Sequence, residues 1–381
     1  MISRIISDAI RTTKKSVLLL GPRQVGKSTL VARLNPDLSI NLADELEFMT
    51  HSAQPDELGK LIELQAAKTI FIDEVQRLPR ILNTVQAIVD KQKKLKFYLT
   101  GSSARKLKRG GANLLPGRVI NFKLGPIIAA EMDYKFNTAH VLSRGTLPEI
   151  CLPESVREAE RLLLSYAANY LKEEIKAEAL TRNLESFARF LNEAVLSVAQ
   201  FIDLTKIAKK TKISRHAVPR YFEILEDTLI GYRIQPFTPL MASQDLIRHP
   251  KFYLFDNGVY NGMLANFTPS PDRLGVLAEQ TVFTQIMHSA WARELNINVS
   301  SFRTRKGVEV DFILQIENRI FAIEVKGSDN LSAEDCGGLV YFKKAYAKRC
   351  DLFIFHMGQK ERRIGPVWAL PWQQGLRELG L

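Results

Sequence analysis

The stretch "SVLLLGPRQVGKSTLVARL", residues 16–34, constrains the fold of this chain more than any other. It places a short apolar strand directly before the motif Gly21-x-x-x-x-Gly26-Lys27-Ser28, and a helix-forming run follows. Glycines allow the backbone to curl until its N–H groups point at phosphate oxygens, and the following helix adds the positive end of its dipole. The pattern predicts a phosphate-binding loop, because a chance glycine turn would not have both flanks.

The residues of this loop have separate predicted roles. Lys27 is expected to reach the β and γ phosphates of ATP, and the Ser28 hydroxyl is expected to ligate Mg²⁺. ATP and Mg²⁺ are therefore the predicted cofactors. The residues expected to contact the nucleotide belong to the loop and its surroundings: Gly21, Pro22, Arg23, Gln24, Val25, Gly26, Lys27, Ser28, Thr29 and Ser102.

Two further strand-like runs end in polar residues. The run "TIFIDEVQ" delivers Asp73 and Glu74, of which Asp73 is expected to hold the hydrated Mg²⁺ and Glu74 to polarise the attacking water. The run "KFYLTGSS" ends in Thr100, Ser102 and Ser103, which either touch the γ-phosphate or serve only as turn residues.

Strand signals alternate with helical or loop stretches over the first third of the chain, at residues 16–20, 39–42, 69–73, 96–100 and 119–124. This alternation predicts an α/β fold with a parallel sheet, and the nucleotide belongs at the carboxyl ends of its strands. We expect this domain to span residues 1–135.

The chain also resembles the AAA+ ATPases, in particular a group of predicted bacterial and archaeal ATPases with a C-terminal domain of unknown function. The resemblance covers nearly the whole chain and rests on "FIDEVQRLP", "LTGSSARKL", "LPGRVINFKLGP", "GTLPEI" and "KFYLFDNGVY", in that order. It implies ATP hydrolysis, and it implies that Arg118 reaches the γ-phosphate of a neighbouring subunit in a homo-oligomer. The alternative is that Arg118 pairs with an acid of its own domain.

Composition points to a polyanionic partner. Apolar residues make up 46% and charged residues 25% of the 381, as in soluble globular proteins, and the formal net charge is +12. This charge favours a polyanionic partner such as nucleic acid or an anionic surface, and DNA is the partner favoured once the middle and C-terminal patterns below are added. The basic run "KQKKLKFYLTGSSARKLKRGG", residues 91–111, is either a solvated face or a contact to the phosphate backbone.

The cysteines and the first residues favour a cytoplasmic protein. Cys151, Cys336 and Cys350 form no C-x-x-C pair, so neither a disulfide framework nor a zinc site is predicted. Charged residues interrupt the N-terminal apolar run, unlike in a signal peptide, and no later run is long enough to span a membrane. The N-terminal isoleucines are expected to form the buried stripe of a first helix: Ile2, Ile5, Ile6 and Ile10.

The middle of the chain is predicted to be helical. Residues 136–190 show helical periodicity and are expected to form a connecting region. Residues 191–245 show a helix ending near Lys210, a turn, a second helix capped by Ser214, and a strand opening near Ile230. This order is typical of a winged helix-turn-helix, whose cations are expected to contact DNA: Lys209, Lys210, Arg215 and Arg220. The alternative is a module that only packs against the ATPase domain.

The stretch "VEVDFILQIENRIFAIEVKG", residues 308–327, carries charges inside two apolar strands. A hairpin turn at Glu317-Asn318 would place Asp311 opposite Glu324 and Glu309 opposite Lys326. Opposed side chains lie about 5 Å apart at Cβ, so two carboxylates require a cation between them, and Mg²⁺ or Mn²⁺ is expected there.

This stretch, with Asp and then Glu-x-Lys, resembles the PD-(D/E)xK nuclease core, which implies a restriction-endonuclease-like domain over residues 246–381. The resemblance makes Glu279 the further acid on a preceding helix, so that Glu279, Asp311 and Glu324 hold the metal while Asp311, Glu324 and Lys326 perform catalysis. The alternative is an inactive scaffold in which Glu309 and Lys326 pair across the hairpin.

The combined prediction is an ATPase that hydrolyses ATP with Mg²⁺, acts on DNA and carries a metal-dependent nuclease. The alternative is a nucleotide-gated DNA-binding or regulatory protein whose last domain cleaves nothing and docks a partner. A small-molecule kinase is disfavoured because Glu74 stands next to Asp73 and no acceptor-binding lid is evident.

Overall fold

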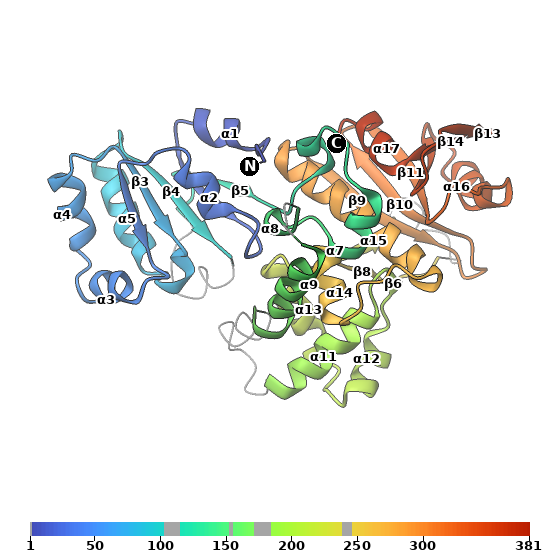
Figure 1. Ribbon diagram of the computed structural model, residues 1–381, viewed down its shortest axis with the longest axis horizontal. Helices are drawn as coiled ribbons and strands as arrows, with labels where there is room; N and C mark the ends of the chain where they lie inside the picture. The colour runs from blue at the N-terminus through green and yellow to red at the C-terminus, as the bar shows by residue number, and fades with distance from the viewer. Residues whose placement is uncertain (1, 103–114, 152–154, 171–183, 238–245) are drawn as a thin grey trace. The chain divides into compact units, whose positions relative to one another are not determined.

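The chain divides into two units in the computed structural model. Unit 1 holds residues 1–125 and 227–230, and unit 2 holds residues 126–226 and 231–381. Residues 2–102, 115–151, 155–170, 184–237 and 246–381 are described (Figure 1). Over these residues, no helix combines the length and the apolar composition needed to cross a membrane. The finer division of residues 136–381 into three domains stays a prediction.

Unit 1 is built on a five-stranded sheet in the order β2-β3-β4-β1-β5, in which every neighbouring pair is parallel. Its strands are β1 (Ser16–Leu20), β2 (Leu38–Asn41), β3 (Thr69–Asp73), β4 (Lys96–Gly101) and β5 (Val119–Lys123). The five predicted strands and the parallel α/β architecture are thus confirmed. All five residues of β1 are buried because this strand lies between β4 and β5.

Short helices surround this sheet, and α3, α4 and α5 lie beside it in Figure 1. Their bounds are α1 (Ser7–Thr12), α2 (Lys27–Ala32), α3 (Glu45–Ala53), α4 (Glu57–Leu64), the 3₁₀ turn η1 (Val75–Arg77) and α5 (Ile81–Lys91). Of the predicted N-terminal stripe, Ile6 and Ile10 are buried. Ile2 and Ile5 precede the helix and are half-buried, because α1 begins only at Ser7.

Unit 2 contains a nine-stranded sheet in the order β13-β14-β12-β11-β10-β9-β7-β8-β6. Its strands are β6 (Gln200–Phe201), β7 (Gly231–Pro236), β8 (Lys251–Leu254), β9 (Ile297–Arg303), β10 (Glu309–Ile316), β11 (Arg319–Lys326), β12 (Asp351–His356), β13 (Arg362–Ile364) and β14 (Val367–Pro371). Strand β7 pairs with β8 at its start and with β9 at its end, so it joins two parts of the sheet.

The β10–β11 hairpin has the predicted turn. Its antiparallel pairs run from Ile316 with Arg319 to Phe312 with Ile323, so residues 317–318 form the connection. Continued by one residue, this register sets Asp311 opposite Glu324, as alternation predicted. The pairing of β10 with β9 shifts between Val310 and Ile313, which leaves Asp311 at an irregular point of the sheet.

The helical segments of unit 2 are η2 (Ala129–Met132), α7 (Thr138–Arg144), α8 (Pro148–Cys151), α9 (Val156–Ser165), the π-helical turn η3 (Tyr166–Tyr170), α11 (Leu184–Leu196), α12 (Leu204–Thr211), α13 (Ala217–Asp227), α14 (Asn257–Met263), α15 (Pro271–Ala292), η5 (Glu334–Cys336), α16 (Gly337–Tyr346) and α17 (Trp372–Glu378). The prediction that Ser214 caps the second helix is wrong, because α13 begins at Ala217. A helix begun at Arg215 would need an N–H at Pro219, which proline lacks, whereas Pro219 is tolerated in the first turn of α13.

Aromatic side chains fix α13 against its neighbours in unit 2. The rings of Phe190 on α11 and Phe222 on α13 lie 4.8 Å apart in an edge-to-face arrangement, and Phe222 lies 5.1 Å from Phe252 on β8. Such pairs add to the gain from burial. One face of α13 therefore packs into unit 2 and cannot contact a partner.

Candidate functional sites

The predicted phosphate-binding loop connects β1 to α2 in unit 1. Gln24 and Gly26 adopt left-handed conformations with φ of 57° and 90°, which curl the loop. At Gly21 a Cβ atom would lie 2.2 Å from the Leu124 carbonyl oxygen, so only glycine fits. Helix α2 has six residues, so the loop N–H groups matter more than its dipole.

Two cationic side chains, those of Lys27 and Arg4, stabilise the conformation of the loop. The buried Lys27 ammonium, in a residue 5% exposed, donates to the carbonyl oxygens of Gly21 at 3.0 Å and Pro22 at 2.9 Å. Arg4 donates to the carbonyl oxygens of Val25 and Gly125, both at 2.8 Å. Sequence reasoning missed Arg4, since the motif gives no signal for a brace 21 residues upstream.

The polar ends of β3 and β4 meet, as the parallel sheet requires. Thr100 Oγ1 donates to Asp73 and accepts the Glu74 N–H at 3.2 Å. Gln76 Nε2 donates to Glu74 and to Ser102 Oγ, the latter at 3.2 Å. Glu74 itself has a left-handed φ of 57°, a strained conformation that often marks functional positions. Sequence reasoning missed Gln76, although it lies two residues after Glu74.

The two predicted Mg²⁺ ligands of unit 1 face one hollow. A pocket of about 700 Å³ is lined by residues of α2, β2, α3 and β3, among them Ser28, Asn41, Glu47 and Asp73. A hydroxyl and a carboxylate beside the loop are the donor types that Mg²⁺ prefers, so these residues fit the ion.

Other predicted residues of unit 1 have local partners. The Arg118 guanidinium binds both carboxylate oxygens of Asp90, at 2.6 and 3.0 Å, so the predicted pairing within its own domain is present. Lys96 donates to three carbonyl oxygens at the end of α1, so this member of the basic run braces a helix. Ser103 and the basic residues after it in the run lie outside the described residues.

Comparison with protein families matches residues 13–132 to the AAA domain. The chain carries an AAA-type, ATPase-like domain. Beyond it, two domains of unknown function match: DUF8612 over residues 136–270 and DUF4143 over residues 274–374. Among curated proteins nothing matches.

Solved structures similar to the chain include replication initiation proteins. The replication initiator DnaA bound to AMPPCP and single-stranded DNA is 12% identical, with 58% of this chain and 86% of that chain covered and a TM-score of 0.29. A DNA replication initiation factor is 13% identical, with coverages of 58% and 86% and a TM-score of 0.27. Domain III of DnaA from Thermotoga maritima is 13% identical, with coverages of 58% and 89% and a TM-score of 0.24. At TM-scores this low the likeness carries no argument.

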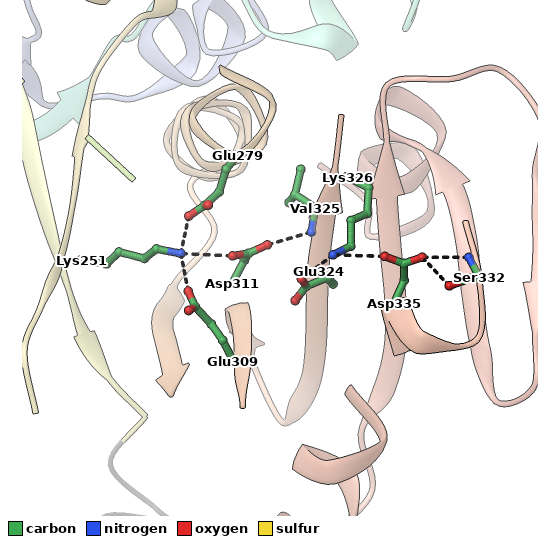
Figure 2. A network of polar contacts seen from close by, with 9 residues as sticks. All are labelled: Lys251, Glu279, Glu309, Asp311, Glu324, Val325, Lys326, Ser332 and Asp335. Atoms are coloured by element: carbon green, nitrogen blue, oxygen red, sulfur yellow. Dashed lines mark hydrogen bonds and ion pairs between the residues drawn. The ribbon is translucent and has the colours of Figure 1, made fainter. Parts of the chain in front are cut away.

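Outside the AAA domain, acids of unit 2 surround a lysine (Figure 2). The Lys251 ammonium on β8 lies 2.6 Å from Glu279 on α15, and 2.9 Å and 3.1 Å from Glu309 and Asp311 on β10. The lysine side chain is only 3% exposed. We call Lys251, Glu279, Glu309 and Asp311 the acid cluster.

The remaining predicted residues pair beside this cluster. Lys326 binds Glu324 at 3.1 Å and Asp335 at 3.4 Å (Figure 2). The predicted pairing of Glu309 with Lys326 is wrong, because Glu309 binds Lys251 and lies 3.6 Å from Arg303. The physical reason is that Lys251, which lies 58 residues earlier in the chain, supplies the cation 2.9 Å from Glu309.

Burial and mutual repulsion perturb the acids of unit 2. Burial, followed by the charge of Asp311, raises the pKa of Glu279 to about 8. The same causes raise the pKa of Glu324. Burial alone would lower the pKa of Lys251, but Tyr253 and the carboxylates outweigh it and raise that pKa well above its ordinary value. One ammonium thus compensates three carboxylates incompletely.

The acid cluster does not fit a divalent ion as it stands. Searched over the described residues, unit 2 offers no group of three or more His, Cys, Asp or Glu side chains arranged to hold a metal. The Lys251 ammonium occupies the space between the carboxylates of Glu279, Glu309 and Asp311. Sequence reasoning missed Lys251, although a lysine opening the buried strand "KFYL" signals a buried partner.

The predicted DNA-contacting cations are exposed, but not on one helix face. Lys209 and Lys210 end α12, and Lys210 binds Glu193 at 3.0 Å. Arg215 lies in the turn before α13, and Arg220 lies on α13 beside the exposed Glu223. The positive surface therefore follows α12 and the turn more than the second helix.

Proposed function

We propose that the AAA domain binds and hydrolyses ATP with Mg²⁺. The observation that carries this proposal is that the loop follows β1 and that Asp73 and Glu74 lie at the end of β3, both at the carboxyl ends of parallel strands, while Ser28 and Asp73 line one hollow. Mg²⁺, held by Ser28 and Asp73, would neutralise charge on the phosphates. The loop N–H groups and Lys27 bind and orient the triphosphate.

Glu74 is the proposed residue that orients the attacking water. Gln76 and Thr100 support this role, since the first donates to the Glu74 carboxylate and the second accepts its N–H. Ser102 accepts a hydrogen bond from Gln76, which supports the proposal that Ser102 also belongs to the nucleotide site. Arg118 would have to leave Asp90 before it could act on a neighbouring subunit.

Two substitutions test the ATPase. Lys27→Ala should remove most ATP binding in calorimetry, whereas Glu74→Gln should keep binding and lower turnover by about 100-fold or more. Lys14→Ala and Glu63→Gln are matched controls, because both residues are exposed in the same unit. Wild-type turnover in Glu74→Gln would remove Glu74 from the mechanism.

We further propose DNA as the partner, bound along α12 and the following turn. Exposed cations concentrate there, and the chain has a formal net charge of +12. Phosphate contacts release counterions, so affinity should fall steeply with salt. The helix-turn-helix pattern of the sequence agrees with DNA binding. The packing of α13 adds no support, because one face of this helix is buried in unit 2.

The DNA proposal is tested by salt titration. Reversing Lys209 and Arg215 to Glu should reduce the slope of log affinity against log salt by about 2, since each lost phosphate contact removes about 0.9. Reversing Lys343 and Lys344 on α16 makes the same charge change elsewhere and should matter less. Equal effects of the two pairs would contradict a localised site.

A metal-dependent nuclease in unit 2 is the second candidate. The residue types Glu279, Asp311, Glu324 and Lys326 favour it, but the position of Lys251 does not. We therefore favour the reading in which unit 2 binds a partner and cleaves nothing.

A further inference from the structure

The ammonium group of Lys251 serves as a cation that the chain itself supplies to the acid cluster. A lysine ammonium has three N–H donors, and three carboxylates from two elements surround this one. On another side the ring of Phe201 lies 5.4 Å from Nζ, where its negative face attracts a cation. The cavity is thus built around a monovalent, hydrogen-bonding ion.

The distances fit N–H donors and not a metal. Carboxylate oxygens lie 2.6 to 3.1 Å from Nζ, the range of charge-assisted hydrogen bonds. Mg²⁺ requires oxygens at about 2.0–2.1 Å and retains several waters. The Lys251 side chain is only 3% exposed and faces the Phe201 ring, so the site is shielded from the water that the ion would retain.

Two of the acids also accept hydrogen bonds from groups other than Lys251. Asp311 uses its second oxygen to accept the Val325 N–H at 2.9 Å (Figure 2). Glu279 accepts the Tyr253 hydroxyl on the oxygen that also faces Lys251. A metal would have to replace these donors as well as the ammonium.

Lys251 also connects parts of the sheet that do not pair. Strand β8 is separated from β10 by β7 and β9 in the sheet order, yet Lys251 on β8 binds two acids on β10. Glu279 adds α15 to the same ion. The cluster therefore links β8, β10 and α15 through a single ammonium group.

We propose that Lys251 permanently takes the place of a divalent cation in the acid cluster, so that unit 2 is independent of metal and does not cleave phosphodiesters. This inference does not depend on the proposed ATPase. It makes a positive prediction: removing the lysine should create a metal site from Glu279, Glu309 and Asp311.

The test uses the full chain without nucleotide. Mn²⁺ titration calorimetry and melting temperatures compare wild type, Lys251→Ala and Lys251→Ala with Asp311→Asn. Wild type should show no Mn²⁺-dependent shift and leave plasmid DNA intact. Lys251→Ala should melt at lower temperature, gain Mn²⁺ binding and recover part of the loss with Mn²⁺. The added Asp311→Asn should abolish that gain. Lys326→Ala, the matched control from the neighbouring pair, should gain nothing.

Several outcomes would overturn the proposal. One is Mn²⁺ binding or metal-dependent cleavage by wild type that Asp311→Asn removes. Another is a folded Lys251→Ala that gains no Mn²⁺ binding. If Lys251→Ala fails to fold, Lys251→Met keeps the apolar stem of the lysine and all three carboxylates. The gain or absence of Mn²⁺ binding in this second variant then decides.

Discussion

Each unit of the molecule buries a lysine, and the two lysines have different partners. Lys27 of the AAA domain donates to carbonyl oxygens of its own loop. Lys251 of unit 2 lies among three carboxylates. Carbonyl oxygens carry only partial charge, so phosphate oxygens can replace them with a gain in attraction. Withdrawing Lys251 would instead leave three carboxylates buried without a cation.

The difference separates a loop that we propose takes up a ligand from a cluster that contains its own cation. At the loop, Gln24 and Gly26 adopt left-handed backbone conformations, and a hollow lined by Ser28 and Asp73 lies beside α2. In unit 2, the polar groups satisfy one another. A buried charge alone therefore does not identify a functional site, and the nature of its partners decides.

The largest stability effect is expected at Lys251. Lys251→Met should lower the free energy of unfolding of unit 2 by about 3–5 kcal/mol, because it leaves buried carboxylates unpaired. The chain has three tryptophans, Trp291, Trp368 and Trp372, all in unit 2, so urea unfolding followed by tryptophan fluorescence reports this unit. Lys27→Met should leave that transition in place. An equal shift of the urea unfolding transition in Lys251→Met and Lys27→Met would contradict the difference between the two lysines.

A buried carboxylate without a lysine sharpens the comparison. Asp256 of unit 2 accepts the N–H groups of Thr146 at 2.8 Å and Val259 at 3.0 Å, and burial raises its pKa to about 6. A raised pKa means that the folded state holds the proton more tightly. Asp256 therefore lowers stability as pH rises from about 4 to about 6, by about 3 kcal/mol for roughly two pKa units.

The measurement is urea unfolding across this pH range, followed by tryptophan fluorescence. Asp256→Asn does not titrate, so it should make the decline between pH 4 and 6 shallower. It should not remove that decline, because burial also raises the pKa of Glu279 and of Glu324 to about 8, and these two groups lower stability over the whole range up to about pH 8. Asp37 of unit 1 behaves in the opposite way. The N–H groups of Thr69 and Lys68 lower the pKa of this exposed carboxyl, so its contribution to stability increases as pH rises. An unchanged slope in Asp256→Asn would assign the titration to other groups.

The smallest effect is expected at the exposed ion pair of unit 1. Arg118 and Asp90 are 34% and 46% exposed, and water screens their attraction. Arg118→Ala should not measurably shift the unfolding midpoint of unit 1 in circular dichroism. If turnover falls in this variant while stability is unchanged, Arg118 acts on ATP, as the AAA+ resemblance implies.

Local sequence patterns predicted the framework of both candidate sites. Apolar runs located the five strands of unit 1, and the glycine motif located the loop before α2. The turn predicted at Glu317-Asn318 gave the register of the β10–β11 hairpin. Such features depend on neighbours in the chain, so the sequence displays them directly. The predicted start of the second helix was wrong, because the fixed geometry of Pro219 outweighed a favourable cap at Ser214.

The sequence by itself determined the position of the glycine-rich loop between β1 and α2, the polar ends of the strands and the acids of the hairpin. Only the tertiary structure decided what faces those acids. Lys251 lies 58 and 60 residues before Glu309 and Asp311, on a strand that does not pair with theirs. No periodicity links such positions, because their contact arises from the way β7 passes from β8 to β9 and brings distant strands together. A metal ligand and a lysine partner look alike in sequence, and only packing tells them apart.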